Sequence, residues 1–194
     1  MKAKILIILI LPAVLASCRK EVGRYDLTEA QKQIIPYEKG QVISFINSEG
    51  KTDNVTVTEN KLYWDEEIID SGGFIDNCVM FFKTKKVTLK SEEGNLVIYL
   101  KLIANGKDVS PGYVNCSFLI DIRPIGYFDL SNAFDTEGNF LIGGIHDSLE
   151  INGKIYYNVI EKTQVPIQFF YNKTYGILQI KRNGENYLTL KSEP

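Results

Sequence analysis

Few residues in this chain have the chemistry of a catalytic centre, and the most suggestive of them are consecutive. His146, the sole histidine, is followed by Asp147 and Ser148. A serine hydrolase triad needs three side chains that meet at one point. Neighbouring residues of a strand point to opposite faces, so His146 and Ser148 would lie together and Asp147 would point away. No nucleophile-elbow motif accompanies them, and we expect no catalytic residue here.

Carboxylates are the other candidates, at Asp65-Glu66-Glu67 with Asp70 and from Asp135 to Asn139. Ca²⁺ takes several oxygen ligands, but the second segment lacks the spacing and the distal glutamate of a calcium loop. A retaining glycosidase needs two carboxylates about 5 Å apart across a cleft. We expect solvated loops at both segments, and a non-enzymatic protein with no metal and no cofactor. A hydrolase is the less favoured alternative.

The first 17 residues have the pattern of an export signal. Lys2 and Lys4 form a short positive segment, and Ile5 to Val14 is an apolar run interrupted only by Pro12. Ten residues of helix reach about 15 Å, half the thickness of the hydrocarbon core, so this run is too short for a stable transmembrane helix. It predicts a secretory signal peptide over residues 1–17.

The end of this segment, Leu15-Ala16-Ser17-Cys18, resembles the lipobox of bacterial lipoproteins. The resemblance implies cleavage before Cys18, a thioether from its sulfur to a diacylglycerol, and acylation of the new amine. Each buried methylene contributes roughly 0.8 kcal/mol, so two or three acyl chains would hold the protein at the membrane. A plain signal peptide with an incidental cysteine is the alternative.

The residues after Cys18 bear on location. Many Gram-negative lipoproteins that stay at the inner membrane have an aspartate next to the lipidated cysteine, and this chain has Arg19. The cell envelope, with an anchor in the outer membrane, is therefore the expected location. Residues 18–25 are predicted to form a lipidated, flexible tether.

Cys78 and Cys116 are the other two cysteines, and each begins an apolar run. An exported protein can form disulfides. A Cys78–Cys116 bridge would close a loop of about 38 residues and stabilise the fold by roughly 4 kcal/mol. Two buried free thiols are the alternative. Two cysteines and one histidine without a CxxC spacing do not predict a zinc site.

Composition indicates a single globular domain over residues 26–194. Hydrophobic residues are 44% and charged residues 24% of the chain, which excludes a disordered protein. The formal net charge is -2, and without Lys2 and Lys4 the mature chain has 20 basic against 24 acidic residues. A mildly acidic chain without a basic stripe is a poor binder of nucleic acid.

Periodicity predicts an antiparallel all-β domain, either a β-sandwich or a half-barrel, with one short N-terminal helix. The helix is expected within residues 26–35, where Thr28 and Gln31 form a capping-box pattern and Pro36 follows. Beyond it, polar and apolar residues alternate with period two. Asn152-Gly153 and Asn183-Gly184 are predicted to close two-residue hairpins.

Most of the mature chain is similar to uncharacterised exported lipoproteins of Bacteroidota-type bacteria. The similarity lies in Leu27 to Gly40, in Ile151 to Val159 and in Phe170 to Ile177. It supports location and fold and implies no catalytic residue. Paired aromatic residues such as Tyr156-Tyr157 place rings on both faces of a strand, one in the core and the other free to bind a ligand.

The expected function is therefore the binding of an unknown envelope ligand or protein, or a structural role, at a membrane to which the lipid anchors the chain. A lipid or lipoprotein carrier is the alternative. In that case Leu178, Ile180, Leu188 and Leu190 would line an open concave face.

Overall fold

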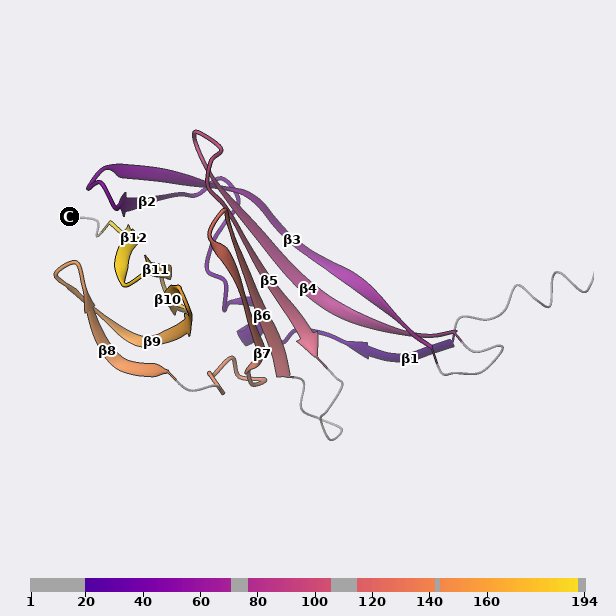
Figure 1. Ribbon diagram of the computed structural model, residues 1–194. Coiled ribbons are helices and arrows are strands. Elements are labelled where there is room, and N and C mark those ends of the chain that lie inside the picture. The colour runs from indigo at the N-terminus through magenta and orange to yellow at the C-terminus, as the bar shows by residue number, and fades with distance from the viewer. Residues whose placement is uncertain (1–19, 71–76, 106–114, 142–143, 192–194) are drawn as a thin grey trace, which may run out of the picture.

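The computed structural model describes residues 20–70, 77–105, 115–141 and 144–191. The predicted signal peptide and Cys18 lie outside the described residues. Within them the chain is nearly all strand, with one short helix, and forms one sheet curled into a half-barrel (Figure 1). The all-β prediction is confirmed, and the half-barrel is the observed architecture.

The elements follow one another in chain order. They are β1 (Lys20–Tyr25), α2 (Glu29–Lys32), β2 (Val42–Asn47), β3 (Thr52–Asp70), β4 (Asn77–Ser91), β5 (Val97–Asn105), β6 (Asn115–Arg123), β7 (Gly126–Phe134), β8 (Ile145–Ile151), β9 (Lys154–Gln164), β10 (Ile167–Asn172), β11 (Gly176–Arg182) and β12 (Glu185–Leu190).

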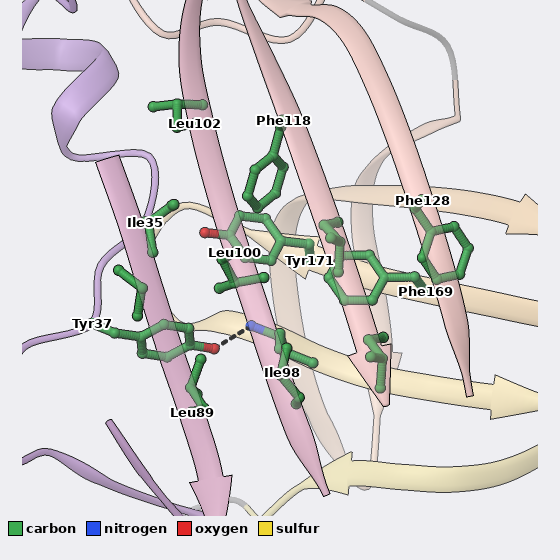
Figure 2. Close-up of a cluster of buried hydrophobic side chains, with 14 of the residues drawn as sticks. Ile35, Tyr37, Leu89, Ile98, Leu100, Leu102, Phe118, Phe128, Phe169 and Tyr171 are labelled. Carbon is green, nitrogen blue, oxygen red and sulfur yellow. Dashed lines mark hydrogen bonds between the residues drawn. The ribbon is translucent and has the colours of Figure 1, made fainter. Parts of the chain in front are cut away.

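The sheet has the order β7-β6-β5-β4-β3-β2-β12-β11-β10-β9-β8. Neighbours in this order are antiparallel, and most are joined by short turns. Pairing of β2 with β12, where Ile46 lies opposite Thr189, joins the two halves of the sheet. The halves then curl toward each other, so that β10 and β11 lie across from β5 and β6 (Figure 2).

Strand β1 lies off this path and corrects the predicted tether. It pairs in parallel with Cys78–Phe82 of β4, beyond Thr84–Lys90, the part of β4 that pairs with β5. Lys20–Tyr25 therefore forms a strand and is not a flexible segment. Together β1 and the distal parts of β3 and β4 form a ribbon that projects from the half-barrel (Figure 1). We call it the ribbon below.

The concave face of the half-barrel is filled by side chains from both halves. Leu89, Ile98 and Leu100 from one half are fully buried, as are Phe169 and Tyr171 from the other (Figure 2). Aromatic rings meet across the core, with centroids 5.2 Å apart for Phe118 and Tyr171 and 5.7 Å apart for Phe128 and Phe169. Burial of these rings is the main source of stability.

The segment before β2 closes one side of this core. Ile34 and Ile35 are buried in it, and two tyrosine hydroxyls bond to backbone there. Tyr171 donates to the Ile34 carbonyl at 2.6 Å, and the Ile177 amide donates to the Tyr37 hydroxyl at 2.6 Å (Figure 2). These bonds satisfy polar groups that burial would otherwise leave unpaired.

Helix α2 is shorter than the predicted range but has the predicted cap. The Thr28 hydroxyl accepts from the Gln31 amide, and the Gln31 side chain accepts from the Thr28 amide. Asn152-Gly153 and Asn183-Gly184 also close the expected hairpins, with positive φ at all four residues. Positive φ at both central residues is what a type I′ turn requires.

The predicted Cys78–Cys116 disulfide is not formed, because Cys116 is a buried free thiol. Cys116 lies opposite Ala104 in β5, next to the pair of Ile103 with Thr84 in β4. Cys78 is five to six residues farther along β4, which is roughly 17–20 Å at the rise of a strand. A disulfide requires Cα atoms within about 7 Å.

The four aliphatic residues expected on an open concave face are packed instead. Ile180 and Leu188 belong to the filled core. Leu178 packs on the other face of the sheet with Ile151, Tyr156, Val159 and Phe170, and Leu190 contacts both groups. A bulge at Leu178 sets this division, since Phe170 lies opposite Gln179 while Tyr171 lies opposite Ile177.

Candidate functional site

A pocket of about 430 Å³ lies on the half-barrel, on the side away from the ribbon. Four separate segments line it: residues 36–37 with 41–44, residues 154 and 156, residues 174–175, and residues 190–191. Its volume is in the range of small-molecule sites, roughly 300–1,000 Å³. We call it the tyrosine-lysine pocket, after Tyr156, Tyr175, Lys154 and Lys191.

Paired strands and tight turns position the lining. Leu190 of β12 lies opposite Phe45 of β2, which brings the start of β2 beside the end of β12. Lys154 follows the Asn152-Gly153 turn directly and is the first residue of β9. In the turn between β10 and β11, the Asn172 side chain accepts from the Tyr175 amide at 2.8 Å and fixes that residue.

Gly176 leaves room for the Tyr37 ring, which lines the pocket. Its φ is +77°, and a Cβ atom there would overlap the Tyr37 hydroxyl. Only glycine takes this conformation readily while leaving room for the ring. The buried Tyr37 ring therefore lies against the start of β11 and forms part of the pocket lining. Burial keeps the pKa of Tyr37 well above its ordinary value, so the phenol stays neutral.

Aromatic rings and an ammonium group meet in the pocket. The rings of Tyr156 and Tyr175 are perpendicular, with centroids 5.4 Å apart. The Lys154 ammonium lies 4.7 Å from the centroid of Tyr175 and 5.5 Å from that of Tyr156. Tyr175 is 43% exposed and Tyr156 only 1% exposed. The pocket thus offers one accessible ring next to a positive charge.

The Tyr156 hydroxyl has no hydrogen-bond partner among the described residues, although it is buried. A buried polar group left unpaired costs about 1–3 kcal/mol, and most such groups in proteins are satisfied. Burial, and the neighbouring Tyr175, raise the pKa of Tyr156, so its hydroxyl is protonated at neutral pH and is able to donate. It is an unpaired donor in a residue that lines the pocket, and it is shielded from solvent.

The positive charge of the pocket has no counter-charge among its described lining residues. Lys154 and Lys191 are its two ionisable cations, and none of the lining residues is an aspartate or glutamate. Lys191 donates to the Thr52 hydroxyl at 3.4 Å. The two ammonium groups attract anions and donate hydrogen bonds, so the pocket is suited to binding an anionic ligand.

The residues singled out for catalysis do not converge. His146 Nε2 lies 2.8 Å from Glu161 Oε2 across the β8–β9 ladder. Ser148 lies opposite Tyr157, and both Asp147 and Ser148 are exposed. His146 is thus part of a cross-strand pair with an acid that the sequence did not indicate.

One of the two acidic segments differs from its prediction. Asp65, Glu66, Glu67 and Asp70 lie within strand β3 and not in a loop, and Asp65 pairs with Lys101 of β5 at 2.9 Å. Asp135 to Asn139 does form a turn, in which Asp135 accepts from the amides of Glu137 and Asn139. No cluster of three or more potential metal ligands occurs in the part of the chain that the structure describes.

Sequence reasoning named two pocket residues, Tyr156 and Leu190, and missed the rest. The Tyr156-Tyr157 pair has one buried and one exposed ring, as expected, with exposures of 1% and 65%. Lys154, Tyr175 and Lys191 come from three different turns or strand ends. No local motif connects them, because the pocket exists only once β2 and β12 are paired.

Comparison with known proteins gives no relative for this chain: no protein-family model, no curated protein and no solved structure matches it. Among the described residues there is no helix with the length and hydrophobicity needed to cross a membrane. Function must therefore be argued from the site itself.

Proposed function

We propose that this protein is a lipid-anchored, non-enzymatic binding protein of the bacterial cell envelope, which holds a small ligand in the tyrosine-lysine pocket. Cys18 would carry the lipid, and the outer membrane is the proposed location. The Leu15-Ala16-Ser17-Cys18 motif supports the anchor, and its similarity to Bacteroidota-type lipoproteins supports the class of organism.

The relative position of β1 and the pocket is the observation that carries this proposal. Strand β1 begins at Lys20, two residues after Cys18, at the free end of the ribbon. Strands β2, β9 and β12, which contribute lining residues to the pocket, lie in the half-barrel on the opposite side of the molecule (Figure 1). From Cys78 to Thr84 the ribbon is about 20 Å long at the rise of a strand. A lipid at Cys18 would thus leave the pocket open, facing away from the bilayer.

The packing of the half-barrel bears on the carrier alternative. A carrier for lipid needs an open apolar cavity, whereas Leu178, Ile180 and Leu188 are buried against other side chains. The described pocket is lined by tyrosines, lysines and uncharged polar residues, together with four apolar residues, Pro36, Val42, Ile43 and Leu190. This mixture of charged, polar and apolar groups supports a ligand with polar groups rather than a bare acyl chain.

Replacement of the proposed lipidation site tests the anchor. The Cys18→Ala protein should incorporate no labelled palmitate and should leave the membrane fraction. Wild type and Cys116→Ala, which changes the buried thiol, should both label and sediment with membranes. Equal labelling of Cys18→Ala and wild type would refute the anchor.

A further inference from the structure

The ligand chemistry of the tyrosine-lysine pocket follows from three of its properties: its charge, its exposed ring and its uncharged polar groups. This inference rests on the proposed binding function, and it names the class of molecule that the site takes.

Charge selects an anion. The chain carries a formal net charge of -2, yet the two ionisable side chains of the lining that are charged at neutral pH are Lys154 and Lys191. The Lys154 ammonium is placed over tyrosine rings, and it forms no ion pair with a carboxylate in the described part of the chain. Partial removal from water strengthens the attraction of such a group for a ligand anion.

The exposed ring of Tyr175 favours a ligand with an apolar face. Tyr175 lines the pocket and is 43% exposed, with the Tyr156 ring perpendicular to it and the Lys154 ammonium over it. An aromatic face buries flat apolar surface at little cost in conformational entropy. A sugar ring has such a face on its C–H side and has hydroxyl groups around its edge.

Polar groups suited to ring hydroxyls surround these tyrosines. Gln41, Ser44 and Thr174 line the pocket, and the Tyr156 hydroxyl beside it lacks a partner among the described residues. The Tyr156 hydroxyl is buried, so a ligand oxygen reaches it only when a neighbouring side chain moves aside; the bond would then satisfy a group that is otherwise unpaired and break no existing hydrogen bond.

We propose that the tyrosine-lysine pocket binds a sugar ring that carries one anionic group, with the ring on Tyr175, the anion near Lys154 and Lys191, and a ring oxygen on the Tyr156 hydroxyl. A carboxylate, as in a uronic acid, and a sulfate ester share this chemistry.

Calorimetric titration of the full-length protein in detergent tests the ligand class. The probes are glucuronate, glucose 6-sulfate, glucose and acetate. At least one of the two anionic sugars should bind ten times more tightly than glucose and acetate, and the stronger of them identifies the anion. The ligand class would be overturned if glucose or acetate bound as tightly as both anionic sugars, or if no probe bound.

Two lysine variants locate the anion, and an exposed lysine provides the control. Lys154→Gln and Lys191→Gln should each weaken binding of the anionic sugar about tenfold and leave binding of glucose unchanged. Lys90→Gln, at an exposed position outside the pocket, should bind like wild type. Unchanged affinity in both pocket variants would contradict the assignment.

Tyr156→Phe separates a ligand contact from a structural one. The variant keeps the ring and removes only the unpartnered hydroxyl, so the urea midpoint should stay constant or rise while affinity falls several-fold. A lower midpoint, or unchanged affinity, would refute the role given to this hydroxyl. Loss of sugar binding in a protein that still labels at Cys18 would leave the membrane anchor standing, so the two proposals fail separately.

Discussion

Glu59 is the residue whose charge contributes most visibly to this fold. Its carboxylate lies 2.8 Å from the Lys61 ammonium and 3.0 Å from the Lys86 ammonium, and it accepts from the Thr88 hydroxyl at 3.0 Å. The Lys61 contact first, then Lys86 and Thr88, lower the pKa of Glu59 from 4.5 to about 2. The folded state therefore favours the ionised carboxylate.

This shift predicts an acid-dependent loss of stability. A carboxyl whose pKa is lower in the folded state stabilises the protein fully above about pH 4.5, and that contribution disappears as the pH falls toward 2. Because solvent screens this partly exposed cluster, Glu59→Gln should cost about 1 kcal/mol at pH 7. The cost should shrink toward zero near pH 2.5.

Urea unfolding of wild type and Glu59→Gln at both pH values measures the effect. Glu92→Gln, an exposed turn variant, serves as the control and should match wild type at each pH. A gap between wild type and Glu59→Gln that is equal at pH 7 and pH 2.5 would show that the charge of Glu59 is not its source.

Among the elements, those set by neighbouring residues could be predicted, and those set by distant ones could not. The capping box at Thr28 and the Asn-Gly turns act over two to four residues, so the sequence identifies them directly. Alternation also predicted the strands. A half-barrel and a sandwich share this pattern, and only the curl of the sheet separates them.

Distant pairing explains what the sequence did not indicate. Residues 20–25 form β1 because the edge of β4 beyond β5 offers unpaired backbone groups, and this depends on the length of β4. Lys85 is charged, yet it lies on the core face of β4 with Val87 and Leu89. Its ammonium caps the carbonyls of Lys32 and Ile35, at 2.6 and 2.8 Å. Such a bond replaces water for a half-buried lysine, whose pKa burial lowers.

Strand β1 makes an element-scale prediction, because a strand and a tether differ in backbone protection. Amides of Arg24 and Tyr25 should exchange with solvent at least tenfold more slowly than an unstructured peptide, since β1 pairs with β4 and the Tyr25 ring stacks on Phe82 at 5.5 Å. Hydrogen exchange followed by mass spectrometry measures this.

Phe82→Ala removes that stack and should speed exchange in β1, while exchange in the β8–β9 hairpin stays constant. The hairpin is the internal control because its contacts lie in the other half of the sheet. Unprotected β1 amides in wild type would mean that the segment is a tether after all.

At the scale of the whole molecule, the half-barrel and the ribbon differ in how they are stabilised. The half-barrel is built on a continuous core that joins strands of both halves. Of the described ribbon residues, Val79, Met80 and Phe82 are buried but belong to neither core cluster. A three-stranded ribbon with so small an apolar face is weakly stabilised on its own.

The ribbon should therefore open before the half-barrel unfolds. Trp64, the sole tryptophan, reports on it, because its ring lies in the ribbon between the Arg24 guanidinium and the Lys83 ammonium, at 4.8 and 4.5 Å. Trp64 fluorescence should change at a lower urea concentration than the far-ultraviolet circular dichroism, which follows the whole sheet.

The Phe169→Ala variant tests this separation, since Phe169 lies in the core of the half-barrel. It should lower the free energy of unfolding measured by circular dichroism by several kcal/mol, and the free energy measured by Trp64 fluorescence much less. Coincident transitions in wild type and in the variant would show instead that the ribbon and the half-barrel unfold as one cooperative unit, and that the long β3–β4 ladder transmits the stability of the core to the ribbon.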